Sequence, residues 1–98
     1  MTQTTDDLPV WAHVYVHGHV QGVGFRAFAA KAATELNLVG GVRNLDDGRV
    51  EVDVEGRKTM IDAFIEKLKI GPPAGRVTQI EIQWGSASGR YSTVSIWR

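Results

Sequence analysis

The sequence of 98 residues contains no cysteine, and this absence excludes several classes of protein. Without cysteine, the chain has no disulfide framework, no thiolate metal ligand and no cysteine nucleophile. An excess of charge is also lacking, because eleven Lys and Arg side chains balance eleven Asp and Glu side chains. A dedicated DNA-binding domain usually has a basic excess, so the balanced charge disfavours a nucleic-acid partner.

The sequence also lacks an apolar run long enough to span a membrane and lacks the features of a signal peptide. Residues 1–9 are polar and aperiodic, which predicts a flexible leader. A hydrophobic fraction of 43% is normal for a globular protein, and residues 10–98 are expected to form one domain. We therefore expect a cytoplasmic monomer with no membrane partner.

Two kinds of hydrophobic periodicity follow this leader and predict five strands and two helices. Alternation with a period of two predicts strands over 10–17, 39–45, 50–55, 77–84 and 91–97. Apolar residues at three- and four-residue spacing predict helices over 25–36 and 61–68. Gly56 is expected to end the third strand, and a capping box at 59–62 is expected to begin the second helix.

The resulting order is β-α-β-β-α-β followed by a further strand, which is typical of the ferredoxin-like split β-α-β arrangement. This is an α+β fold, a two-layer sandwich in which both helices cover one face of an antiparallel sheet. The first and third strands are expected to be central. Acidic residues alternate with valines in the third strand, which predicts a wet sheet face rather than a cation site for Glu51, Asp53 and Glu55.

The most informative segment is the glycine-rich stretch 18–26, which joins the first strand to the first helix. Unpaired N–H groups at a helix N-terminus attract anions, and successive amides of a glycine loop can form a concave anion site. The helix dipole opposes a cation such as Arg26 in the first turn, unless an anion binds there. The spacing matches neither a P-loop nor a dinucleotide-binding motif. From these features alone, both an anion cradle and a simple turn of the chain stay open.

Other polar and aromatic residues have structural interpretations. Asn44 precedes the turn at 46–48, where a turn-capping role is the more common one. Asp46 and Asp47 fit a solvated turn better than a pair of acid/base groups. Histidines without acidic neighbours in the sequence make a poor metal site, and the tryptophans are expected to pack rather than to stack on bases. These residues are His13, His17 and His19, and Trp11, Trp84 and Trp97.

Two stretches of the sequence resemble the signatures of the acylphosphatase family. The first is Gly18-His19-Val20-Gln21-Gly22-Val23-Gly24-Phe25-Arg26, and the second is Gly41-Val42-Arg43-Asn44 followed by Asp47-Gly48. The segment 71–77 is also similar to that of bacterial members, and the similarity extends over residues 10–97. The ferredoxin-like fold of this family agrees with the order of elements read from the periodicity.

The resemblance implies an enzyme, an acylphosphatase, that hydrolyses the carboxyl-phosphate bond of small acyl phosphates to a carboxylate and inorganic phosphate. By position, Arg26 matches the arginine that binds the phosphoryl group, and Asn44 matches the asparagine that orients the attacking water. The loop whose backbone amides hold phosphate oxygens corresponds here to Val20, Gln21, Gly22, Val23, Gly24 and Phe25. No metal, organic cofactor or nucleic acid is implied. The acyl group is expected to be read poorly, which predicts broad specificity.

One departure from the family pattern is Gly41, where many members carry a bulky aromatic residue; we expect looser packing or a wider site there. His19 is expected to put a titratable group near the phosphate, with a modest effect of pH on substrate binding. Three other interpretations stay open: a non-catalytic anion-binding module on the same fold, the acylphosphatase-like domain of larger hydrogenase maturation proteins, and a nucleic-acid module. The short chain disfavours the second, and the neutral charge disfavours the third.

Overall fold

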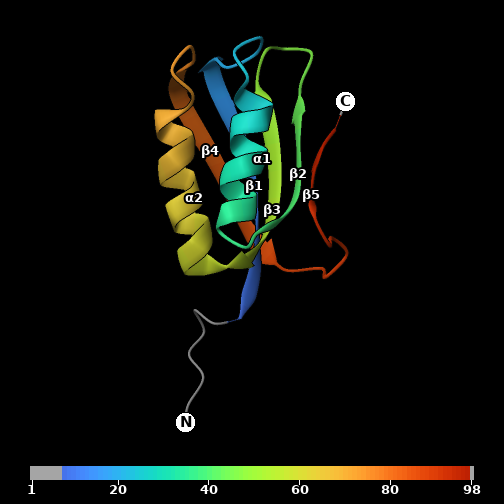
Figure 1. The fold of residues 1–98 in the computed structure, drawn as a ribbon. Helices are drawn as coiled ribbons and strands as arrows, with labels where there is room; N and C mark the ends of the chain where they lie inside the picture. Colours follow the sequence, from blue (N-terminus) through green and yellow to red (C-terminus); the bar gives the residue numbers. More distant parts are fainter. Residues whose placement is uncertain (1–7, 98) are drawn as a thin grey trace.

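Two helices cover one face of a five-stranded sheet in the computed structural model, which describes residues 8–97 (Figure 1). The predicted flexible leader falls almost entirely outside the described residues. The α+β ferredoxin-like fold predicted from the order of elements is confirmed. In chain order the elements are β1 (Pro9–His19), α1 (Phe25–Glu35), β2 (Val39–Asn44), β3 (Val50–Arg57), α2 (Lys58–Ile70), β4 (Arg76–Ser86) and β5 (Val94–Ile96).

The strands lie in the order β4-β1-β3-β2-β5, so β1 and β3 are central, as expected. The first four strands pair antiparallel. In contrast, β5 pairs parallel with β2 and is shorter than the predicted strand over 91–97. Figure 1 shows why the pairing is parallel: the chain leaves β4 at the end of the sheet where β2 begins, crosses that end and then runs alongside β2 in the same direction. The complete sheet is therefore mixed.

The hydrophobic core lies between the sheet and the two helices. Every second residue of β1 and β3 faces the helices, and burying each such aliphatic side chain contributes roughly 1.5–3 kcal/mol. Alanines on the buried face of α1 let this helix pack closely on the sheet. The fully buried core includes Val14, Val16, Val52, Val54, Phe25, Ala29, Ile61, Phe64 and Leu68. No helix within residues 8–97 is long and apolar enough to cross a membrane.

Three predicted element boundaries are wrong. The third strand does not stop at Gly56 but continues to Arg57, because Gly56 still pairs with Val10 of β1. The predicted capping box at 59–62 is absent, since α2 begins at Lys58 and no side chain in the described part of the chain caps its N-terminus. β1 likewise runs on to His19, into the stretch that the sequence assigns to a loop, through an irregularity in its pairing with β4.

The face of the sheet opposite the helices is not the wet face predicted for the third strand. Glu51 and Glu55 are only 6% and 4% exposed. Arg43 Nε donates a hydrogen bond to Glu51, and His13 Nε2 lies 2.9 Å from the same carboxylate. Burial alone would raise the pKa of Glu51, but these two hydrogen bonds outweigh it and hold that pKa below its usual value. The alternation could not reveal these partners because they come from other strands.

Glu55 is buried by the segment that leads from β4 to β5. The backbone N–H groups of Ser88 and Gly89 donate to its carboxylate over 3.0 Å, and the Ser88 hydroxyl donates over 2.7 Å. Burial alone would raise the pKa of Glu55, but these donors outweigh that effect and lower it. The prediction of a solvated acidic row fails here because the crossing segment covers this end of the sheet.

The tryptophans and histidines lie in mixed surroundings. Trp11 packs on the open sheet face and donates its indole N–H to Asp53 over 2.9 Å. Trp84 is 43% exposed, so the prediction that it packs is wrong; Lys58 Nζ lies 4.8 Å from the centre of its ring. The carboxylates beside His13 are those of Glu51 and Asp53 on β3, which lie far from His13 in the sequence. Within residues 8–97, no three His, Cys, Asp or Glu side chains are placed to hold a metal ion.

Candidate active site

The glycine loop (residues 18–24) turns the chain from the end of β1 into α1. Gly22 and Gly24 have φ angles of 74° and 78°, which lie in the left-handed region. This region costs a residue with a Cβ atom about 1–2 kcal/mol. A Cβ atom at either position would meet nothing within 4 Å, so the backbone angle rather than lack of space requires glycine.

The N-terminus of α1 is left without a side-chain cap. Gly24 is the N-cap residue, no side chain within residues 8–97 bonds to the first N–H groups, and the first turn has no acidic residue. The first N–H groups of a helix have no partner within the helix, and they form the positive end of its dipole. An anion in front of this turn would satisfy both.

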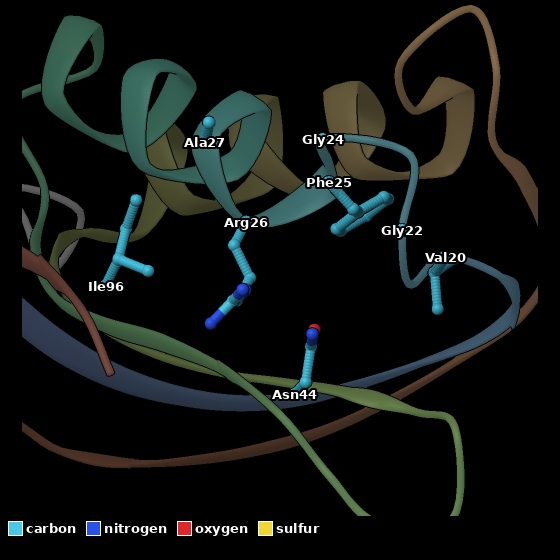
Figure 2. Close-up of a pocket in the computed structure, with 8 residues that line it drawn as sticks. All are labelled: Val20, Gly22, Gly24, Phe25, Arg26, Ala27, Asn44 and Ile96. Atoms are coloured by element: carbon cyan, nitrogen blue, oxygen red, sulfur yellow. The ribbon is translucent and has the colours of Figure 1, made fainter. Parts of the chain in front are cut away.

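A pocket of about 220 Å³ opens between this helix end and the sheet (Figure 2). Two of the predicted loop residues, Gln21 and Val23, do not line it. The others do, and they are joined by both predicted catalytic residues. The lining residues are Val20, Gly22, Gly24, Phe25, Arg26, Ala27, Asn44 and Ile96.

Arg26 extends from the first turn of α1 down toward the sheet, as Figure 2 shows. Its Nη1 donates a hydrogen bond to the backbone oxygen of Trp97 over 3.2 Å. No described carboxylate pairs with this guanidinium. Because a guanidinium has five N–H donors in a planar fork, Arg26 keeps donors for a ligand in the pocket.

Asn44 ends β2 and points into the same pocket from the sheet side (Figure 2). Its Oδ1 atom is buried, and no described residue donates a hydrogen bond to it. Within residues 8–97 it is the one buried side-chain nitrogen or oxygen atom in this condition. An unsatisfied buried acceptor costs about 1–3 kcal/mol, so such an atom calls for a functional explanation.

The turn after Asn44 does not use the side chain of Asn44. Backbone hydrogen bonds close it instead, from Leu45 N to Arg49 O and from Gly48 N to Leu45 O. Asp47 is exposed, as expected for a solvated turn, and the backbone N–H of Arg49 lowers the pKa of its carboxyl group. The turn-capping interpretation of Asn44 is therefore wrong.

The side chain of Gln21 joins the glycine loop to that same turn. Its Nε2 donates to the backbone oxygens of Leu45 and Arg49 over 2.7 Å and 2.9 Å. These bonds fix the loop relative to Asn44, which is adjacent to Leu45. The sequence offers no signal for this contact, because the two partners lie 24 and 28 residues further along the chain.

The C-terminal segment closes one side of the pocket. Trp97 N donates to the backbone oxygen of Val42 over 2.7 Å, next to the β5–β2 pairing. The Trp97 indole lies against Gly41, where an added Cβ atom would be 2.0 Å from Trp97 Cζ2. The expectation that Gly41 loosens the packing is wrong, since the indole fills the space. His19 is exposed and does not line the pocket.

The fold and this site together define a small α+β protein in which an arginine and an asparagine line one pocket at the uncapped N-terminus of a helix. A family model described as Acylphosphatase matches residues 12–96, and the chain belongs to that family.

Relatives of known identity support the same family assignment. The acylphosphatase of Thermus thermophilus is 54% identical over 74 residues, which cover 76% of this chain and 84% of the relative. The crystal structure of acylphosphatase from Bacillus subtilis aligns with a TM-score of 0.88 at 37% identity, covering 91% of this chain and 99% of that one. HypF of Thermococcus kodakarensis aligns at 42% identity with a TM-score of 0.78, but over only 12% of its length. The protein is thus an enzyme of the acylphosphatase type, which hydrolyses acyl phosphates.

Proposed function

We propose that the backbone amides of residues 20–25 and the Arg26 guanidinium bind the phosphoryl group, while Asn44 orients the attacking water. The observation that carries this proposal is the buried Asn44 Oδ1, which has no donor among the described residues and belongs to a side chain that lines the same pocket as Arg26. A carboxamide oxygen accepts a hydrogen bond from water. It does not titrate near neutral pH, so it orients the water without removing its proton.

The proposed role of Arg26 and of the backbone N–H groups is to stabilise the negative charge of the phosphoryl group. In phosphoryl transfer the charge is spread over the equatorial oxygens, and catalysis consists mainly of positioning and electrostatic stabilisation. The planar fork of Arg26 suits two such oxygens, and the uncapped N–H groups of α1 supply further donors. All of these donors are fixed by the fold before the substrate binds, so they need no reorganisation during the reaction.

The reaction then needs no acid/base side chain. Water attacks phosphorus, the bond from phosphorus to the acyl oxygen breaks, and its electron pair leaves with the carboxylate. The proton of the water passes to an oxygen of the substrate's own phosphate group. Because a carboxylate is a good leaving group, no general acid is required, and Arg26 is the one charged side chain among the described lining residues.

Hydrolysis of acetyl phosphate in water enriched in ¹⁸O tests this proposal. We expect enzyme-dependent release of inorganic phosphate that contains the label, and unlabelled acetate. Label in the acetate would show attack on the carbonyl carbon and would contradict the role given to Asn44. A rate equal to that of the enzyme-free control would instead support a non-catalytic anion-binding module.

We further propose that residues 10–98 act as one domain, a cytoplasmic monomer that needs neither a metal ion nor an organic cofactor. The support is that elements of a single five-stranded sheet domain line the pocket and that the proposed chemistry uses amides, an arginine and water. Light scattering after gel filtration should give the mass of one chain. Activity should be unchanged by EDTA.

A further inference from the structure

We propose that Ile96 is a specificity-determining residue that contacts the acyl group, so that the enzyme prefers acyl phosphates with an uncharged alkyl or aryl group. This inference rests on the proposed function, because it takes the phosphoryl group to lie at Arg26 and the glycine loop. It differs from the broad specificity expected from the sequence, in which no residue for the acyl group was identified.

Ile96 is an apolar residue in an unusual place. It belongs to the three-residue strand β5, lies opposite Val42 of β2, and is 51% exposed. A single exposed isoleucine on a surface needs no explanation. Ile96, however, lines the pocket that also contains Arg26 and Asn44. Its methyl groups have nothing to offer a bare phosphate, but they suit the apolar part of a substrate.

Of the four apolar side chains that line the pocket, two offer exposed surface and two do not. The two that do not are Val20 and Phe25, which are each 1% exposed because they pack into the core. Ala27 and Ile96 are exposed, and Figure 2 shows both on the side of Arg26 that lies away from the glycine loop. We call this pair the acyl shelf. A phosphoryl group held by the loop and Arg26 would leave its acyl group beside this shelf.

The size and charge of the pocket agree with this assignment. Its volume of about 220 Å³ is several times the roughly 30 Å³ that one water molecule occupies in the liquid, so a small acyl group fits beside the phosphate. Arg26 is the one charged side chain among the described lining residues. A second phosphate or a carboxylate on the acyl group would therefore find no further cation among them, whereas a phenyl or alkyl group would bury the exposed face of Ile96.

Substrate comparison tests the shelf directly. We would measure kcat/KM for benzoyl, acetyl and carbamoyl phosphate, the last two differing by a methyl and an amino group of similar size. Wild type should prefer benzoyl over acetyl, and acetyl over carbamoyl phosphate. Ile96→Ala should lower kcat/KM for benzoyl phosphate about tenfold and change the other two less, because a lost apolar contact costs about this factor. The inhibition constant of inorganic phosphate should stay the same.

Two further variants separate polarity from packing. Ile96→Thr and Ile96→Val have side chains of the same shape, so only the threonine variant should lose preference for acetyl over carbamoyl phosphate. Ile82→Ala serves as the control, because Ile82 is 36% exposed on β4 and does not line the pocket. It should leave all three substrates unchanged.

Other outcomes would contradict the role proposed for Ile96. An equal loss on all three substrates with weaker phosphate inhibition would show that Ile96 only supports Arg26, and it would overturn the assignment. Unchanged kinetics of Ile96→Ala would overturn it as well. Should wild type release phosphate from none of the three, the proposed function itself fails and takes the acyl preference with it.

Discussion

Two side chains at the site are placed where folding alone would not favour them. Arg26 stands in the first turn of a helix whose dipole opposes a cation by about 0.3–1 kcal/mol. Asn44 buries an acceptor without a donor, at about 1–3 kcal/mol. A bound phosphoryl group and its attacking water would relieve both. In the proposed function the anion is bound by one arginine and several amides, so the binding does not depend on the net charge of the chain, which is zero.

Sequence reasoning identified only part of this site. The positions of Arg26 and Asn44 came from the family resemblance, and the need for glycines came from turn chemistry. The Gln21 side chain, Ile96 and Trp97 were missed. Each of the three acts through a contact with a distant segment, and no local pattern encodes such a contact.

Arg26→Lys should lower kcat/KM for acetyl phosphate about 100-fold or more. A lysine keeps the charge, but its ammonium cannot reproduce a planar, two-pronged contact with phosphate oxygens. Steady-state phosphate release measures the effect. Lys31→Ala on the same helix is the control, since Lys31 is exposed outside the pocket. An Arg26→Lys enzyme within threefold of wild type would rule out bidentate binding.

Among the elements, β5 is the shortest, and its last residue and the residue that follows it both reach the site. Ile96 lines the pocket, and the Trp97 carbonyl accepts from Arg26. The sequence predicted a strand here, but its parallel pairing with β2 depends on a segment about 50 residues earlier in the chain. Gly41 lets the Trp97 indole lie against β2, because a Cβ atom there would overlap the ring.

Gly41→Val should therefore destabilise the protein by about 1–3 kcal/mol, as overpacking commonly does, and should weaken phosphate inhibition. The new side chain would displace the Trp97 ring and with it the carbonyl that Arg26 contacts. Urea unfolding and the phosphate inhibition constant measure the two effects. Adding Trp97→Ala to this variant should cost less than adding it to wild type, because the ring no longer competes with the valine. Strictly additive costs would refute the contact.

The whole molecule has two different sheet faces. The order of elements correctly predicted that helices cover one face, because the crossover rules leave few alternatives. The other face was predicted to be wet, whereas it contains Glu51 and Glu55 in hydrogen-bonded, buried positions. Alternation shows which residues share a face, but it cannot show that a crossing segment or a neighbouring strand covers that face.

Stability should depend on pH through these two carboxylates. Their pKa values are lowered in the folded protein from an ordinary value of 4.5, so their charged forms stabilise the fold above this pH. The free energy of unfolding should thus fall as the pH drops through and below about 4.5. In Glu55→Gln the fall should be shallower. Urea unfolding between pH 7 and pH 3 measures it.

Glu66→Gln provides the matched control for this pH dependence. Glu66 is exposed and forms an ion pair with Lys69 on the same helix, so this variant should follow wild type. If Glu55→Gln lost stability in parallel with wild type and Glu66→Gln, the buried carboxylate would not be a source of the acid sensitivity.

The most direct test of the proposed chemistry is phosphate release from acetyl phosphate by wild type and Asn44→Ala in parallel, with Arg26→Ala as the comparison. We expect Asn44→Ala to lower kcat about 100-fold or more while the phosphate inhibition constant changes little, because the variant loses the oriented water and keeps the anion site. Arg26→Ala should lose phosphate binding as well. A fully active Asn44→Ala protein would contradict the water-orienting role on which the mechanism depends.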